Sequence, residues 1–83
     1  MPIFYVPTAI AQLGALPKAA QVRIKKKLDF YAKQEDPLHF AKHLVGYDAY
    51  RFRIGEYRVI FALEQRALCI LMIVKRDEAY SEL

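Results

Sequence analysis

Residues 50–63 constrain the fold more than any other part of the chain, because they read as two strands joined by a very short turn. Apolar residues alternate with arginines before Gly55-Glu56, and β-favouring residues follow this dipeptide. Glycine in the first of two central positions is typical of a type II′ hairpin turn. Such a turn fixes the register, so we expect Arg53 to lie directly opposite Arg58.

Side chains alternate between the two faces of a strand, so the register also predicts which hairpin residues lie together. Arg51, Arg53 and Arg58 should share one face. Like charges directly opposite each other weaken a hairpin by up to about 1 kcal/mol, which suggests that this face binds a polyanion. Alternatively, the arginines splay apart and pair with Glu56 or Glu64. The residues expected on the opposite face, against the helices, are Tyr50, Phe52, Ile54, Tyr57, Val59 and Phe61.

A further strand is expected over residues 68–74, which are continuously apolar and therefore suit a central strand buried on both faces. Lys75 and Arg76 follow directly. The length of the preceding turn, within residues 64–66, decides which of these two basic residues joins the arginines. A loop of two or four residues favours Lys75, a loop of three favours Arg76, and a β-bulge would change either outcome.

The first half of the sequence predicts one strand and two helices. A short strand should cover residues 3–6, and Thr8 suits the N-cap of a helix that Gly14 closes. Pro17 should open a second helix, which ends near Gln34 because another proline lies just beyond. The second helix carries an apolar stripe at helical spacing, formed by Ala20, Ile24, Leu28 and Tyr31.

These elements predict an α+β fold in the order β-α-α-β-β-β, with two helices packed on one face of a mostly antiparallel four-stranded sheet. The 83 residues are enough for one domain, which should span residues 1–83. Residues 37–46 should form a connector. His39 and His43 lie in this connector, but a metal site needs more ligands, so neither a metal nor a cofactor is expected.

The second helix carries much of the positive charge. Residues 17–34 hold six lysines and arginines against one aspartate, a formal charge of +5, whereas the whole chain has +4. A small basic domain suggests a nucleic-acid partner or an acidic protein partner. The lysines opposite the apolar stripe are either contacts to a phosphate backbone or a simple solvated face, and they are Lys18, Lys25, Lys26 and Lys33.

The sequence gives no sign of a membrane segment or a secretion signal. Residues 1–13 contain no basic leader, and the longest apolar run, residues 67–74, is too short to span a bilayer. The single cysteine, Cys69, suits a reducing compartment. We therefore expect a cytoplasmic protein with no membrane partner.

Three stretches together resemble the RelE/ParE superfamily of toxins from type II toxin–antitoxin systems. They are Leu44-x-Gly46, then Tyr50-Arg-Phe-Arg-Ile-Gly-Glu-Tyr-Arg-Val-Ile-Phe61, then Val74-Lys-Arg-Asp-Glu-Ala-Tyr80. Superfamily members show a leucine and glycine, a strand with paired basic residues, a Gly-acid-Tyr-Arg hairpin, and a closing basic pair followed by tyrosine. The resemblance covers nearly the whole chain and is more specific to the superfamily than to one activity.

For a RelE-like chain the resemblance implies a ribosome-dependent endoribonuclease that cuts mRNA in the ribosomal A site. The 2′-hydroxyl attacks the scissile phosphate, and no cofactor takes part. The implied partners are a cognate antitoxin protein, the ribosome and mRNA. Two other functions are compatible with the same resemblance: inhibition of DNA gyrase, as in the ParE branch, and a catalytically degenerate module that only binds an antitoxin.

The resemblance also implies roles for individual residues. Arg51 and Arg53 stand where the family has paired basic residues, usually lysines, and Arg58 matches its phosphate-binding arginine. Arg76 matches a late arginine that stabilises the transition state or protonates the leaving oxygen. Tyr80 matches the C-terminal tyrosine.

The general base is not assigned by this resemblance, because arginine stays protonated and is a poor base. Glu56 and His43 are the substitutes, and histidine has the better intrinsic pKa. Lys75 sits where many relatives have histidine, and it joins the lysines of the second helix as a candidate contact to nucleic acid or the ribosome.

Overall fold

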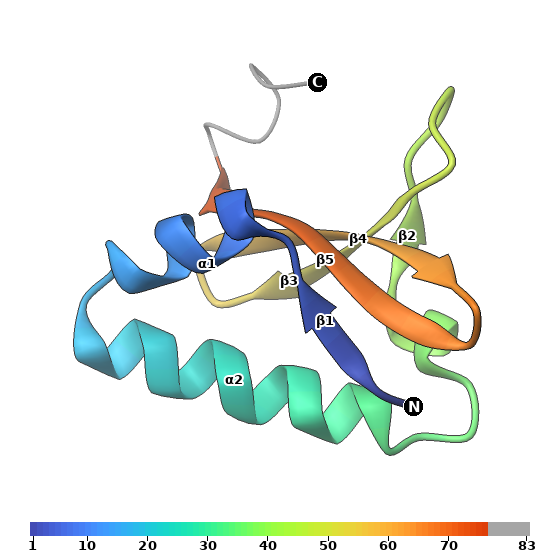
Figure 1. Cartoon of the computed structure of the whole chain (residues 1–83), viewed down its shortest axis with the longest axis horizontal. Helices are drawn as coiled ribbons and strands as arrows, with labels where there is room; N and C mark the ends of the chain where they lie inside the picture. Colours follow the sequence, from blue (N-terminus) through green and yellow to red (C-terminus); the bar gives the residue numbers. More distant parts are fainter. Residues whose placement is uncertain (77–83) are drawn as a thin grey trace.

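The computed structural model describes residues 1–76. Two α-helices and five strands form an α+β fold, which confirms the predicted class (Figure 1). The elements in chain order are β1 (Ile3–Tyr5), α1 (Pro7–Gly14), α2 (Lys18–Ala32), the 3-10 helix η1 (Pro37–Phe40), β2 (Lys42–His43), β3 (Tyr50–Ile54), β4 (Tyr57–Glu64) and β5 (Ala67–Lys75).

The strands form one sheet in the order β1-β5-β4-β3-β2. Among the strand pairs within residues 1–76, only β1–β5 is parallel, so the prediction of a mostly antiparallel sheet is confirmed. The prediction of four strands is wrong, because β2 adds a fifth within the expected connector. It pairs Lys42 with Arg51 and His43 with Tyr50, and a strand of two residues is too short to show an alternating pattern.

The core lies between α2 and one face of the sheet, as Figure 1 shows. Tyr31 of α2 stacks on Phe52 with 4.3 Å between ring centroids, and Phe52 stacks on Phe61 of β4 at the same distance. The predicted apolar side of the hairpin is confirmed as part of this core, since Ile54, Tyr57 and Val59 are buried there too. We call the sheet face away from α2 the outer face.

Helix α1 covers the edge of β5 beyond the end of β1. The Gln12 side-chain oxygen accepts a hydrogen bond of 2.8 Å from the Ile73 backbone N–H, which therefore needs no strand partner. The prediction that Thr8 is the N-cap is wrong: Val6 occupies that position, with Pro7 next to it. Proline suits the first helical turn, because its missing N–H would lack a partner within the helix anyway.

The hairpin between β3 and β4 has the predicted register, with Arg53 opposite Arg58. Gly55 has a φ of +60°, and Glu56 is not among the residues with positive φ, as a type II′ turn requires. A Cβ atom on Gly55 would lie 2.8 Å from Nη1 of Arg23, so the guanidinium of this α2 residue lies against the turn.

Replacing Gly55 by valine should lower the free energy of unfolding by about 1–3 kcal/mol, because a β-branched residue is strained at positive φ. Urea unfolding measures this loss. Gly14→Ala is the matched control: its φ is not positive and its added Cβ would meet no atom within 4 Å. An equal loss in both variants would contradict the role given to the turn.

Candidate nucleic-acid interface

Basic side chains from two neighbouring strands line one groove on the outer face. Arg51 and Arg53 extend from β3, and the register places Lys42 of β2 directly beside Arg51. Together with His39, Phe40 and Ala41 they line a groove of about 300 Å³, which we call the basic groove. Arginine guanidinium groups bind phosphate through paired hydrogen bonds, so these residues can hold a nucleic-acid backbone.

The 3-10 helix η1 brings His39 to this groove. Asp36 precedes it, and its carboxylate accepts a hydrogen bond of 3.2 Å from the Leu38 N–H. The backbone N–H groups of His39 and Ala41 then bond to Asp36 and Leu38 respectively. These contacts turn the chain from α2 into β2, so that His39 and Lys42 lie at the same groove.

Arg58 lies on the outer face with Arg53, as predicted, but its side chain is buried. Its exposed fraction is 1%. It belongs to β4, an interior strand, and its neighbours on the outer face, Ile60 and Val74, are buried as well. Arg58 thus places a buried positive charge next to Arg53, and its role as a phosphate ligand stays a prediction.

A β-bulge decides on which face of the sheet Lys75 lies at the end of β5. The loop between β4 and β5 consists of Gln65 and Arg66, which on its own would favour Lys75. The register shifts between Ile60 and Phe61, however, and Lys75 pairs with Tyr57 on the α2 side. Arg76 follows the last residue of β5, and its backbone N–H bonds to the Glu56 carbonyl at 2.8 Å.

The two candidate bases occupy different places. Glu56 is exposed in the hairpin turn, next to the backbone of Arg76. His43 pairs with Tyr50 and contacts its ring with 5.1 Å between centroids, on the α2 side of the sheet. The structure therefore does not bring His43 together with the arginines.

Two groove residues, His39 and Lys42, did not emerge as candidates from the sequence. Lys42 could have been found from its pairing with Arg51, but this pairing can be predicted only if β2 is recognised as a strand. The lysines of α2 are exposed on the side away from the outer face, so they form a separate surface: Lys18, Lys25, Lys26 and Lys33. Tyr80 lies outside the described residues.

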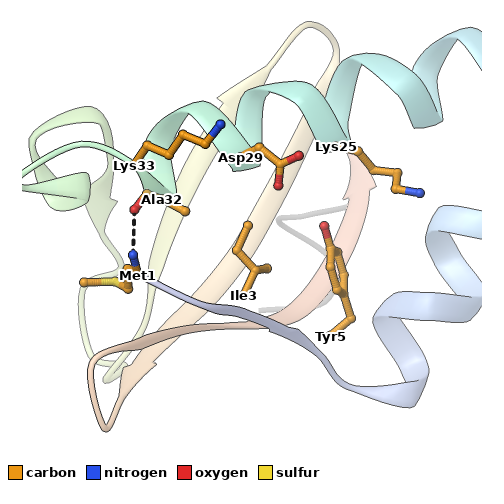
Figure 2. A pocket seen from close by; sticks show the side chains of 7 residues that line it. All are labelled: Met1, Ile3, Tyr5, Lys25, Asp29, Ala32 and Lys33. Atoms are coloured by element: carbon orange, nitrogen blue, oxygen red, sulfur yellow. Dashed lines mark hydrogen bonds between the residues drawn. The ribbon is translucent and has the colours of Figure 1, made fainter.

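A second groove, of about 400 Å³, lies between β1 and α2 (Figure 2). The amino group of Met1 donates a hydrogen bond of 3.0 Å to the Ala32 carbonyl at one end of it. Figure 2 shows Asp29 between Lys25 and Lys33, above the hydroxyl of Tyr5. The carboxylate makes this groove less suitable for a polyanion than the basic groove, which has no acidic residue in its lining.

Burial, and to a lesser degree the charge of Asp29, raise the pKa of the Tyr5 phenol above its usual value of 10.0. Unfolded Tyr5 ionises at a lower pH than folded Tyr5, so the free energy of unfolding should fall as the pH rises above about 10. Tyr5→Phe should lessen this fall, and Asp29→Asn should lessen it slightly. Burial also raises the pKa of Tyr31, so part of the alkaline fall in stability should remain in the Tyr5→Phe variant.

Urea unfolding of each variant between pH 8 and 11 measures this effect. An unchanged alkaline fall in Tyr5→Phe would show that another group causes it.

Within residues 1–76, no group of three or more His, Cys, Asp or Glu side chains lies close enough to hold a metal ion. Neither α1 nor α2 has the length and apolar character that crossing a bilayer demands.

No protein-family model and no curated protein matches the chain. Several solved structures, in contrast, are similar to the chain. The RelB–RelE antitoxin–toxin complex from Methanococcus jannaschii is similar with a TM-score of 0.77 and 19% identity, over 96% of this chain and 98% of the other. The RelE–RelB complex from Pyrococcus horikoshii has a TM-score of 0.71 and 27% identity, over 90% and 93%.

The isolated E. coli RelE toxin is also similar, with a TM-score of 0.75 and 20% identity over 98% of this chain and 92% of the other. These matches extend along nearly the full length of both chains, so the overall fold is shared. The chain therefore has the fold of a RelE-like toxin.

Proposed function

We propose that this protein is the toxin of a type II toxin–antitoxin pair and that it cleaves mRNA on the ribosome. The RelE-like fold supports the first part. The proposal of mRNA cleavage rests on the basic groove, where Lys42, Arg51 and Arg53 line one hollow on the outer face. A groove of this charge suits the phosphate backbone of RNA.

In the proposed reaction the 2′-hydroxyl attacks the adjacent phosphorus and the bond from phosphorus to the 5′-oxygen breaks. The products are a cyclic phosphate and a free 5′-hydroxyl. Arg51 and Arg53 hold the non-bridging oxygens and stabilise the negative charge that grows on them in the transition state. Arg76, directly after β5, is the residue that we propose to act at the leaving 5′-oxygen. Tyr80 keeps the role that the family resemblance implies for it.

We also propose a cognate antitoxin as the protein partner and the cytoplasm as the place of action. The similar structures from Methanococcus jannaschii and Pyrococcus horikoshii are both complexes of RelE with RelB. An acidic segment that folds on binding would cover the basic groove and neutralise Lys42, Arg51 and Arg53. Such a segment would keep the toxin from RNA until the antitoxin is removed.

The experiment that tests the proposal adds the purified protein to a cell-free translation system. We expect translation to stop and primer extension to show message cut at the A-site codon, whereas free RNA stays intact. Normal translation with intact message at high protein concentration would contradict the proposal. Intact message together with lost supercoiling by DNA gyrase would favour a ParE-like function. Harmless overexpression in cells would favour a module that only binds an antitoxin.

A further inference from the structure

We infer that His39 is the general base that activates the attacking hydroxyl in the basic groove. The inference deepens the proposed function and rests on it. Arginine cannot serve as this base because its guanidinium stays protonated at any physiological pH. Histidine is the side chain that accepts and releases protons between about pH 5 and 8. Among the described residues, His39 is the histidine that lines the groove with Arg51 and Arg53.

The position of His39 is fixed from both sides. The backbone N–H of His39 bonds to the Asp36 carbonyl at 3.1 Å, and Asp36 also caps η1 through its side chain. The imidazole meets the ring of Phe40 edge to face at 5.3 Å, and Phe40 in turn stacks on the buried Tyr31 at 5.2 Å. This chain of rings connects His39 to the core, and such support favours a constant side-chain placement.

Charged groups surround the imidazole on two sides. Lys42, Arg51 and Arg53 line the basic groove with it, whereas Glu35 and Asp36 line a neighbouring hollow that His39 also borders. A phosphate held by the three cations would therefore lie on one side of the imidazole, with the carboxylates on the other. The ring itself is exposed, so RNA can reach it.

In the proposed step, His39 removes one proton and one bond to phosphorus replaces another. A ring nitrogen of neutral His39 takes the proton of the 2′-hydroxyl while the oxygen forms its bond to phosphorus. The bond from phosphorus to the 5′-oxygen breaks, and its electron pair stays on that oxygen, which takes up a proton from water. His39 then returns its own proton to solvent, so the enzyme ends unchanged.

The test uses the full chain and ribosomes programmed with a defined message, at a ribosome concentration that saturates each variant. We expect His39→Ala and His39→Gln to lower the single-turnover cleavage rate about a hundredfold, the size usual for a lost general base. His43→Ala, on the α2 side of the sheet, is the matched control and should stay within about twofold of the wild type. Added imidazole should restore part of the rate in His39→Ala but not in His43→Ala.

The pH profile separates catalysis from positioning. The wild-type cleavage rate should rise with pH as the general base loses its proton, and this rise should be absent in His39→Gln. Cleavage at the wild-type rate in His39→Gln would overturn the inference while leaving the proposed function intact. A loss in His39→Ala that added imidazole does not relieve, with the pH profile unchanged, would also overturn it. If the wild type cuts no message, the proposed function fails first and the inference falls with it.

Discussion

Replacing Arg51 and Arg53 together by alanine should reduce mRNA cleavage on the ribosome by at least a factor of about 100. Removing a single positioned group that stabilises transition-state charge often costs that much, and these two side chains supply most of the positive charge of the basic groove. The single variants should each lose less than the pair but not in simple proportion, since groups that hold one phosphate act together. Single-turnover cleavage of a programmed ribosome measures the loss.

A double variant of α2 is the matched control for charge. Lys25→Ala with Lys26→Ala also removes two positive charges, but from exposed positions on the side away from the outer face. It should cleave within about threefold of the wild-type rate. Circular dichroism must show that both variants are folded, because Arg51 is half-buried. Equal losses in both variants would mean that overall charge, and not the basic groove, drives the activity.

Replacing Phe52 by alanine should cost about 3–5 kcal/mol of the free energy of unfolding. Phe52 is fully buried and stacks between Tyr31 and Phe61, so its removal opens a cavity between α2 and the sheet. A chain of 83 residues has roughly 4–12 kcal/mol of stability in total, so the variant would lose about a quarter of it or more. Urea unfolding at 25 °C measures the change.

Phe4→Ala is the control with the same change of side chain. Phe4 is 60% exposed on β1, so its truncation should change the free energy of unfolding by less than about 1 kcal/mol. A small effect at Phe52 as well would show that the ring stack contributes little to the core.

The sequence allowed the β3–β4 hairpin to be predicted in full because its determinants are local. Gly55 accepts the positive φ of the turn, and strict alternation on either side then assigns each residue to a face. The α+β class could be predicted for the same reason, because the apolar stripe ending at Tyr31 indicates a helix and the apolar run of β5 indicates a strand.

Features that depend on distant contacts could not be predicted. Strand β2 exists because β3 supplies its partner, and its two residues carry no pattern of their own. The bulge beside Ile60 places Lys75 on the α2 side, although the two-residue loop taken alone gave the opposite assignment. Alternation also placed Arg58 on the correct face but could not show that this part of the face is buried.

The candidate site was therefore predicted in part. Arg51 and Arg53 were expected together and do line one groove, whereas His39 and Lys42 joined them only through η1 and β2. Of the two substitutes for the base, His43 was preferred to Glu56 for its intrinsic pKa, which does not depend on where the side chain lies. In the structure the short strand turns successive side chains to opposite faces, and this separates His43 from Lys42.

The lengths of the outermost strands bear on how the protein behaves at high concentration. An exposed sheet edge offers unpaired backbone groups that can recruit another molecule and start aggregation. Here the two edges are formed by β1, of three residues, and β2, of two. The apolar β5, the segment best suited to fibril-like pairing, has β4 along one side and β1 with Gln12 along the other. The segment of this chain most prone to aggregation thus lies inside the sheet.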